Sequence, residues 1–431
     1  MGILKAVRGT RDLLPPETEL WNRVEATARA VFARYGFGEI RTPLFEATEL
    51  FARGVGEETD IVSKEMYTWD DRARAASEKA QSLTLRPENT AGVVRAYIEH
   101  KLDESGLLQK LFYIGPQFRR ERPQRGRYRQ FWQIGAEVIG PISSGSESAV
   151  RDAEVLEMLA TLLDELGIRG WRLALNSVGS ATDRPLYVET LRKALEPVKH
   201  QMCEDNQRRA ETNPLRVLDS KDVNDQEIIN SLPKIADYLD DKSREHFEQV
   251  KAALDACGVP YVVEPRLVRG LDYYTRTTFE FTVPDGSGLG TQNALLGGGR
   301  YDGLSEMLGG PKAPGIGFAI GEDRLILTLQ AQAAEAPARK RDAFIAPMGV
   351  AQNPAALQLA KELRAAGLTV EVGDGSFRLR KSFETADKLA RRIVILGEDE
   401  VASGVLTVKE FKSGDQVKIS RADLARALQQ M

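Results

Sequence analysis

Residues 111–140 read LFYIGPQFRRERPQRGRYRQFWQIGAEVIG, and apolar and polar residues alternate towards both ends of this stretch. A period of two predicts two β-strands, which a long loop over residues 119–127 connects. The stretch therefore predicts a pair of neighbouring strands in a sheet.

The two faces of this strand pair differ in their chemistry. Phe112 and Ile134 belong to the apolar face, whereas Arg119, Gln133 and Glu137 belong to the opposite face. An apolar face needs helices over it, and a face with Arg, Gln and Glu is typical of a sheet that forms the floor of a ligand site. We therefore expect the functional site on the polar face.

The flanking sequence predicts two domains. An apolar stripe from Glu17 to Tyr35 predicts a helix, and a strand is expected over residues 37–43. A first domain over residues 1–330, with a charged helical insertion at about 181–258, should precede a linker at 331–341. Alternating strands and helices over residues 342–431 then predict a small parallel α/β domain.

The composition is that of an ordinary globular protein. The chain has 431 residues, 42 % of them hydrophobic, and a formal net charge of −4. Such values exclude global disorder and leave enough apolar surface for a sizeable core. No apolar run reaches the length of a membrane span and the first residues lack the apolar block of a signal peptide, so a cytoplasmic location is expected.

Cysteine and histidine are scarce. The chain has two cysteines, Cys203 and Cys257, and three histidines that stand far from one another and outside the glycine and arginine motifs. This pattern argues against a zinc knuckle, an all-histidine metal centre and a Ser-His-Asp triad. We expect no metal bound by the protein alone, and chemistry that depends on Arg, Glu, Gln and Tyr.

Arginine gathers in the loop between the two strands. Residues 119–129 hold six arginines and one glutamate, a pattern that suits phosphate groups. A solvated basic hairpin without a ligand is the alternative. Further arginines stand in or beside glycine-containing segments at residues 267–276, 297–304 and 315–325. Instead of binding a ligand, such a segment can form a β-bulge with aromatic core residues, or its arginine can be a solvated surface charge.

These segments resemble a known family. Phe118-Arg-Arg-Glu121 is similar to motif 2 of class II aminoacyl-tRNA synthetases, the segment around Pro43 to motif 1, and Gly315–Leu325 to motif 3. Three more segments look specifically like the histidyl-tRNA synthetase family, namely TLRPENTA at 84–91, LVRGLDYY at 267–274 and GGGRYDG at 297–303. Because RGTRD at 8–12 and VILGEDE at 394–400 match as well, the resemblance covers nearly the whole chain.

The resemblance implies a fold and an activity. The fold is an α+β catalytic domain built on an antiparallel sheet flanked by helices, with a helical insertion and a C-terminal α/β anticodon-binding domain. The activity is that of a histidine–tRNA ligase, which activates L-histidine with ATP and transfers it to tRNA(His). Mg²⁺ is expected with ATP, and motif 1 implies a homodimer.

The resemblance also implies roles for individual residues. Glu88, Asn89, Thr90, Arg119, Gln133, Glu137, Arg269, Tyr273 and Tyr274 form the expected histidine site. Within this site, Glu88 and Thr90 are expected to bind the amino group of histidine, and Glu137 and Tyr274 are expected to bind its imidazole ring. ATP is expected at Arg119, Arg269 and Arg324, with Arg119 and Arg269 as catalytic residues, and the tRNA acceptor end at Gln124 and Arg125.

Two rival functions stay open at this point, namely a class II synthetase for another amino acid and a regulatory binding protein of the same family. A relative that senses histidine for ATP phosphoribosyltransferase has no aminoacylating activity, and it typically lacks the C-terminal domain. The present chain departs from the family pattern at Asn89, Trp132 and Glu322-Asp323. The segment Cys203–Asn206 lacks a second cysteine, which argues against a metal there.

Overall fold

The computed structural model describes residues 3–56, 59–71, 81–268, 271, 273–284, 287–289, 293–332 and 340–430. The chain divides into two compact units, Met1–Glu335 and Ala336–Met431. Most of the expected linker, residues 333–339, lies outside the described residues.

The first unit is built on one large sheet, as predicted. Its strands run in the order β1 (Gly38–Glu39), β5 (Gln109–Phe118), β6 (Gln130–Ile139), β11 (Gly315–Gly321), β10 (Ala294–Arg300), β9 (Thr275–Thr282), β7 (Arg172–Ser177), β8 (Tyr261–Val263). The central pairs are antiparallel, whereas β1 with β5 and β7 with β8 are parallel. The sheet is therefore mixed at its two edges.

The predicted faces of the strand pair are confirmed. Phe112 lies opposite Ala136 and Tyr113 opposite Gly135, so apolar and polar residues match across the two strands. Ile134 and Ala136 are buried in the main core.

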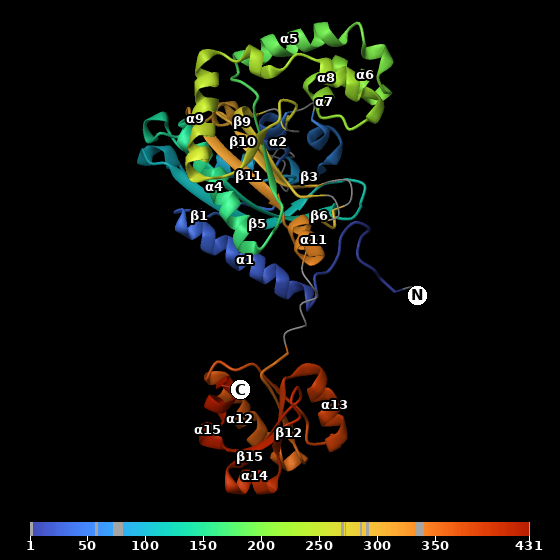
Figure 1. The fold of residues 1–431 in the computed structure, drawn as a ribbon, viewed down its shortest axis with the longest axis vertical. Coiled ribbons are helices and arrows are strands. Elements are labelled where there is room, and N and C mark those ends of the chain that lie inside the picture. Colours follow the sequence, from blue (N-terminus) through green and yellow to red (C-terminus); the bar gives the residue numbers. More distant parts are fainter. Residues whose placement is uncertain are drawn as a thin grey trace, which may run out of the picture. The chain divides into compact units, whose positions relative to one another are not determined.

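Helices cover the apolar face of this sheet. Helix α1 (Glu17–Arg34) turns its stripe of Trp21, Val24, Ala28, Val31 and Phe32 into the main core, which it shares with α4 (Ala149–Leu166) and α9 (Asp241–Cys257). Figure 1 shows α1, α4 and α9 along one side of the strands. The opposite side is left for the ligand site.

The strand expected over residues 37–43 is shorter than predicted. Only Gly38–Glu39 pair with β5. The carbonyl oxygens of Thr42 and Pro43 instead accept hydrogen bonds from the Arg86 guanidinium, at 3.1 and 3.4 Å. This buried arginine, distant in sequence, takes the place of a strand partner.

The predicted insertion is helical. It contains α5 (Asp183–Leu195), α6 (Glu204–Thr212), α7 (Leu215–Leu218) and α8 (Gln226–Ser231), which share a second core. Helix α9, the last of this region, contributes Phe247, Val250 and Leu254 to the main core instead. Part of the region thus belongs to the main core of the first unit.

A small sheet and short helices stand beside the large sheet. The order is β2 (Phe45–Ala47), β4 (Gln81–Leu85), β3 (Tyr67–Asp71), with antiparallel pairs. Helices α2 (Thr48–Val55), α3 (Thr90–Glu99) and α10 (Leu304–Met307) pack nearby. Helix α3 begins at the site residues 88–90.

The second unit has a five-stranded sheet in the order β13 (Val370–Val372), β12 (Ala343–Pro347), β14 (Arg392–Leu396), β15 (Val405–Glu410), β16 (Gln416–Ser420). Its first three strands are parallel, but β15 and β16 form an antiparallel hairpin, so the sheet is mixed and not purely parallel. Helices α12 (Asn353–Ala365), α13 (Leu379–Leu389), α14 (Glu398–Ser403) and α15 (Arg421–Gln430) surround it. Residues 411–415 connect the two strands of this hairpin.

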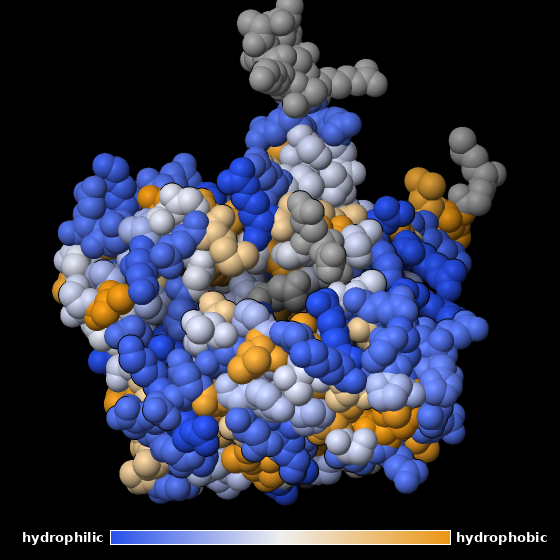
Figure 2. All heavy atoms as spheres, turned by 90° about the horizontal axis from the view of Figure 1, so that it is seen from above, coloured by the Kyte–Doolittle hydropathy of each residue, from blue (hydrophilic) through white to orange (hydrophobic). Residues whose placement is uncertain are grey.

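Among the described residues, no helix is long and apolar enough to cross a membrane. Hydrophilic side chains predominate on the face seen in Figure 2, where apolar side chains form small separate groups.

Candidate active site

The polar face of the large sheet forms the floor of a cavity of about 720 Å³. Its lining comes from β5, β6, β10 and β11, from the starts of α3 and α11 (Glu322–Gln332), and from residues 209 and 219–221 of the helical insertion. This volume is within the range of small-molecule and cofactor sites. The site is thus assembled from segments spread over most of the first unit.

Glu137 lies fully buried beside this floor. One carboxylate oxygen accepts the Thr90 hydroxyl at 2.7 Å and the other accepts the Tyr301 hydroxyl at 2.7 Å. Burial raises the pKa of Glu137 to about 8, although both hydroxyl bonds act to lower it. A buried carboxylate of this kind is suited to a ligand with ring N–H donors.

Gly317 on β11 makes room for this side chain. Gly317 is the strand partner of Glu137, and a Cβ atom at residue 317 would lie 1.7 Å from a Glu137 carboxylate oxygen. Any larger residue would displace the carboxylate. The close approach of the Glu137 side chain therefore explains why β11 has a glycine at residue 317.

The Glu88 side chain caps the N-terminal end of α3. Its carboxylate accepts the backbone N–H groups of Thr90 at 2.7 Å and Ala91 at 3.0 Å. Burial raises the pKa of Glu88, and these backbone hydrogen bonds oppose the rise. Two buried carboxylates, Glu88 and Glu137, therefore flank Thr90, and an ammonium group or N–H donors would offset their charge.

Tyrosine rings surround the carboxylates. The rings of Tyr273 and Tyr274 are 4.8 Å apart between centroids, and Tyr301 lies 5.9 Å from Tyr273. Tyr113, on the polar face of β5, also lines the cavity. Sequence reasoning did not include Tyr113 or Tyr301 in the site, although Tyr301 belongs to a segment that carried the family resemblance.

Arg119 and Gln133 lie on the same floor. The Arg119 side chain donates to the Pro87 carbonyl at 2.9 Å and stacks over the Phe131 ring at 5.2 Å. The Gln133 side chain is buried, and its oxygen has no hydrogen-bond partner among the described residues. Both side chains line the cavity with polar groups available to a ligand.

Arg324 lies at the start of α11. It donates to the Ala294 carbonyl at 2.8 Å and to the Gly126 carbonyl at 3.4 Å, so it ties motif 3 to the arginine-rich loop. Burial lowers the pKa of Arg324, and the neighbouring Arg127 adds to this effect. Two cations close together in a partly buried cavity favour an anionic ligand. Arg127 was not among the predicted site residues.

The remaining predicted site residues lie elsewhere or are not described. Asn89 is buried, but its side-chain oxygen accepts from the Thr42 hydroxyl at 2.5 Å and from Arg86 at 3.2 Å, and it does not line the cavity. Gln124 and Arg125 are exposed at the tip of the arginine-rich loop. Arg269 lies outside the described residues.

Arg300, in the glycine-rich strand β10, points away from the cavity. It is fully buried, donates its Nε to both Asp152 oxygens at 3.1 and 3.2 Å, and bonds the Ser146 carbonyl at 3.0 Å. His246 of α9 bonds the same Asp152 carboxylate at 2.8 Å. This network anchors the end of β10, directly before Tyr301.

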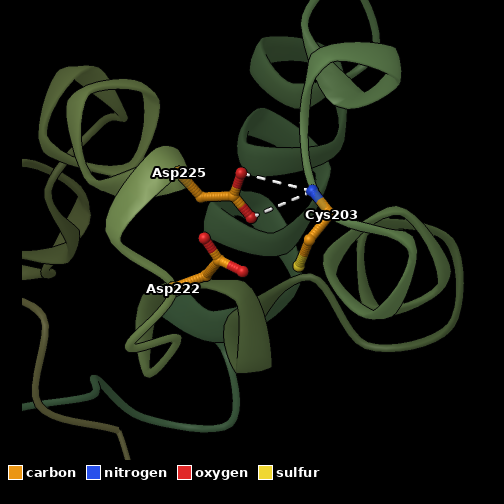
Figure 3. Close-up of side chains that lie close together, drawn as sticks. All are labelled: Cys203, Asp222 and Asp225. Atoms are coloured by element: carbon orange, nitrogen blue, oxygen red, sulfur yellow. Dashed lines mark hydrogen bonds between the residues drawn. The ribbon is translucent and has the colours of Figure 1, made fainter.

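Cys203, Asp222 and Asp225 lie together in the insertion (Figure 3), with their potential ligand atoms within 4.8 Å of one another. Both Asp225 oxygens accept the Cys203 backbone N–H at 3.2 Å, and the Asn206 amide donates to Asp225 at 2.6 Å. The protein's own hydrogen bonds thus account for Asp225. These bonds join the start of α6 to the segment that follows α7.

Family models agree with this geometry. The model described as "Histidyl-tRNA synthetase" matches residues 9–325, and the model described as "Anticodon binding domain" matches residues 342–431. The first match alone spans more than half of the chain and contains every described cavity residue. The chain belongs to the histidyl-tRNA synthetase family.

Individual relatives support the assignment. The histidine–tRNA ligase of Koribacter versatilis is 68 % identical over 98 % of this chain and 95 % of its own length. That of Bacillus subtilis is 46 % identical over 96 % of this chain and 95 % of its own length. The crystal structure of the apo histidyl-tRNA synthetase of S. aureus superposes with a TM-score of 0.80 at 37 % identity, covering 99 % of this chain and all of that chain.

These findings establish the activity. The enzyme is an ATP-dependent histidine–tRNA ligase of class II. The histidine-sensing regulator without aminoacylating activity is not favoured, because highly identical relatives over nearly the full chain are histidine–tRNA ligases and the chain matches the anticodon-binding model over residues 342–431.

Proposed function

We propose that the cavity holds histidine and ATP side by side, with the imidazole at Glu137 and the triphosphate between Arg119 and Arg324. The observation that carries this proposal is Glu137 itself. Its two oxygens are fixed by Thr90 and Tyr301, and its pKa is raised by burial, so pairing with a ring N–H is the interaction that relieves its desolvation.

The amino-acid backbone of histidine then lies towards Glu88 and Gln133. Glu88 and Thr90 take the amino group, and Tyr273 and Tyr274 enclose the side chain beside Glu137. A smaller or apolar side chain would leave the buried Glu137 carboxylate without an N–H donor from the ligand. Such unpaired buried groups discriminate far more strongly than a missing methylene does.

Activation proceeds through attack of the histidine carboxylate on the α-phosphorus of ATP, with release of pyrophosphate. Negative charge accumulates on phosphate oxygens, and fixed cations lower the barrier by stabilising it. Arg119 orients the carboxylate and the α-phosphate, and Arg324 holds the γ-phosphate. Arg269, outside the described residues, is assigned to the α-phosphate through the family resemblance alone.

Transfer to tRNA needs a proton acceptor for the attacking ribose hydroxyl. His246 is committed to Asp152 on the far side of β10, so it is not available for this step. We assign the role to a phosphate oxygen of the adenylate itself. The exposed Gln124 and Arg125 at the tip of the arginine-rich loop then hold the acceptor end of the tRNA.

Mg²⁺ fits this cavity. Glu121 and Glu280 both line it, and both lie near enough to Arg324 to act on its pKa. Mg²⁺ prefers one or two carboxylates together with phosphate oxygens, and it would neutralise part of the β- and γ-phosphate charge when bound with ATP. Glu121 and Glu280 are therefore the proposed protein ligands.

A homodimer is supported by the small sheet that follows motif 1. Leu44, Phe45 and Trp69 are 45, 52 and 40 % exposed, and the rings of Phe45 and Trp69 lie 6.1 Å apart. Large exposed apolar side chains that cluster are typical of a protein interface. Sedimentation of the purified enzyme tests this point, with a dimer expected and a monomer contradicting it.

The domain limits 1–330, 331–341 and 342–431 and a cytoplasmic location complete the proposal. Pyrophosphate exchange, measured with each of the twenty amino acids, tests the substrate assignment. We expect exchange with histidine alone, whereas exchange with another amino acid, or none at all, would contradict it.

A further inference from the structure

The N-terminal segment, residues 7–12, packs against the arginine-rich loop of the catalytic cavity. The Gly9 carbonyl accepts the Arg129 backbone N–H at 2.7 Å. A Cβ atom at residue 9 would lie 2.8 Å from the Cγ atoms of both Arg129 and Pro123, so a larger residue would have to displace the loop. Gly9 has a φ of +91°, a conformation that glycine adopts without strain. The segment therefore lies as close to the loop as a backbone can.

The Arg11 side chain connects the same loop to the start of α11. Its guanidinium carbon lies 4.9 Å from the centre of the Tyr128 ring. Its terminal nitrogens pair with Glu17 at 2.8 Å and with Asp323 at 3.0 Å. Figure 1 shows the N-terminal segment beside α11 before the chain enters α1. Since Tyr128 and Asp323 both line the catalytic cavity, Arg11 holds two parts of its wall together from outside.

Asp323 is the residue directly before Arg324, and it is almost fully buried. Its second oxygen accepts the Trp132 backbone N–H at 3.2 Å, so the same carboxylate also contacts β6. Burial raises the pKa of Asp323, and the hydrogen bond from Arg11 opposes this rise. A buried charge that loses its partner is strongly destabilised, so loss of Arg11 should displace the Asp323 carboxylate. Arg324, its neighbour in the chain, would then move with it.

Arg324 is also in contact with the loop. It donates to the Gly126 carbonyl at 3.4 Å, and a Cβ atom at residue 126 would lie 3.6 Å from its Cγ atom. The loop thus contacts α11 at residue 126 and the N-terminal segment at residues 128 and 129. Displacement of the N-terminal segment would therefore change both the loop and the start of α11, the two elements that meet at Arg324.

We propose that Arg11 is a positioning residue for ATP: by pairing with Asp323 and stacking on Tyr128, it fixes Arg324 relative to the arginine-rich loop. The proposal rests on the proposed function, which places the triphosphate between Arg119 and Arg324. Arg11 acts through its neighbours and touches no substrate. Its loss should weaken the binding of ATP and leave that of histidine unchanged, because Thr90 and Tyr301 hold Glu137 independently of this contact.

Pyrophosphate exchange by the full-length enzyme, with ATP and histidine varied in turn, tests the proposal. Arg11→Met should raise the KM for ATP roughly 2- to 30-fold, the range for residues that act on a site without touching its ligand, with the KM for histidine unchanged. Arg29→Met is the matched control, because Arg29 also pairs with a carboxylate, Glu39, and lies over an aromatic ring, Phe112. An unchanged KM for ATP in a folded Arg11→Met enzyme, an equal rise in both KM values, or equal effects of the two variants overturns the proposal.

A pair of glycine variants tests the same contact without touching the Arg11 ion pairs. Gly9→Ala should push the N-terminal segment away from Arg129 and Pro123 and so raise the KM for ATP as well. Gly36→Ala is its control, because Gly36 has a φ of +77° and no described atom lies within 4 Å of a Cβ atom placed there. Both alanines carry similar backbone strain, so only contact with the loop distinguishes them. The same KM for ATP in both variants contradicts the proposal.

Combining Arg11→Met with Arg324→Met separates this proposal from that for the triphosphate. If Arg11 acts through Arg324, the two losses should not add, and the double variant should have nearly the KM for ATP of Arg324→Met alone. Fully additive losses would refute this route. An unchanged KM in Arg324→Met refutes the triphosphate site itself, whereas a raised KM in Arg324→Met beside a parent value in Arg11→Met refutes only the role of Arg11.

Discussion

Glu137→Gln is the substitution that isolates recognition of the imidazole. The two side chains have nearly the same shape, so Gly317 still leaves room and Thr90 can still donate to the remaining oxygen. The second oxygen becomes an NH₂ group that faces the Tyr301 hydroxyl and the imidazole N–H. The change therefore removes a charge and an acceptor without opening a cavity.

The expected loss follows from the hydrogen bond and the pKa. A hydrogen bond to a charged group contributes about 1.5–3 kcal/mol, or roughly 10- to 150-fold in kcat/KM for histidine. With a folded-state pKa of about 8, Glu137 is ionised at pH 8.5, and the whole loss should appear. At pH 7, ionisation itself costs about 1.4 kcal/mol, so the ratio of parent to variant should be about tenfold smaller.

Histidine-dependent pyrophosphate exchange at pH 7 and pH 8.5 measures both ratios. Glu157→Gln on α4 is the matched control, because Glu157 also accepts a tyrosine hydroxyl at 2.7 Å, from Tyr35, but does not line the cavity. Near-parent exchange in a folded Glu137→Gln enzyme, or a ratio that does not grow with pH, would refute the reasoning.

Three further substitutions test the rest of the site and its support. Arg324→Met should raise the KM for ATP roughly 10- to 150-fold in exchange assays, through loss of charge-assisted bonds to phosphate, and an unchanged KM would remove this residue from the ATP site. Asp152→Asn should lower the free energy of unfolding in urea by about 3–5 kcal/mol, because Arg300 keeps a buried, half-paired charge; a loss below about 1 kcal/mol contradicts this. Glu322 is fully buried without a hydrogen-bond partner among the described residues, and burial raises its pKa to about 9. Since this folded-state pKa exceeds that of the unfolded chain, the parent loses stability as the pH rises from about 4.5 to about 9. The gain in the free energy of unfolding of Glu322→Leu over the parent should therefore increase from about pH 4.5 to about pH 9. A gain that does not depend on pH would show that the pKa of Glu322 is not raised.

The alternation along residues 111–140 was enough to predict which residues lie on the polar face of the strand pair. Gln133 lines the cavity and Glu137 is buried beside its floor, because a period of two places both residues on the same face of a regular strand. The family motifs then supplied the chemical roles, which alternation alone does not give.

Tyr301 could not be assigned in the same way. The pairing of β10 with β9 shifts register between Gly299 and Arg300, so the alternation of the strand changes just before this tyrosine. The shift occurs in the pairing with β9, and at the same point Asp152, from a helix distant in sequence, accepts a hydrogen bond from Arg300. The sequence contains no local signal of either contact.

Contacts between segments distant in sequence explain the other differences between the predicted and the observed structure. The strand expected up to Pro43 ends early because Arg86 donates hydrogen bonds to the carbonyl groups of Thr42 and Pro43. The Asn89 side chain accepts a hydrogen bond from the same arginine and does not line the cavity. Helix α9 has the polar, charged sequence typical of the insertion, but its apolar stripe packs on α4. Helix periodicity predicts such a stripe without indicating its partner.

In the proposed complex, one cavity places an imidazole against Glu137 and a triphosphate between Arg119 and Arg324. A crystal structure of the enzyme with Mg²⁺, ATP and histidinol tests it most directly, since histidinol lacks the carboxylate that would react. We predict a ring nitrogen of histidinol within hydrogen-bond distance of a Glu137 oxygen, and phosphate oxygens at both arginines. An imidazole bound away from Glu137, or phosphates that contact neither arginine, would contradict the account.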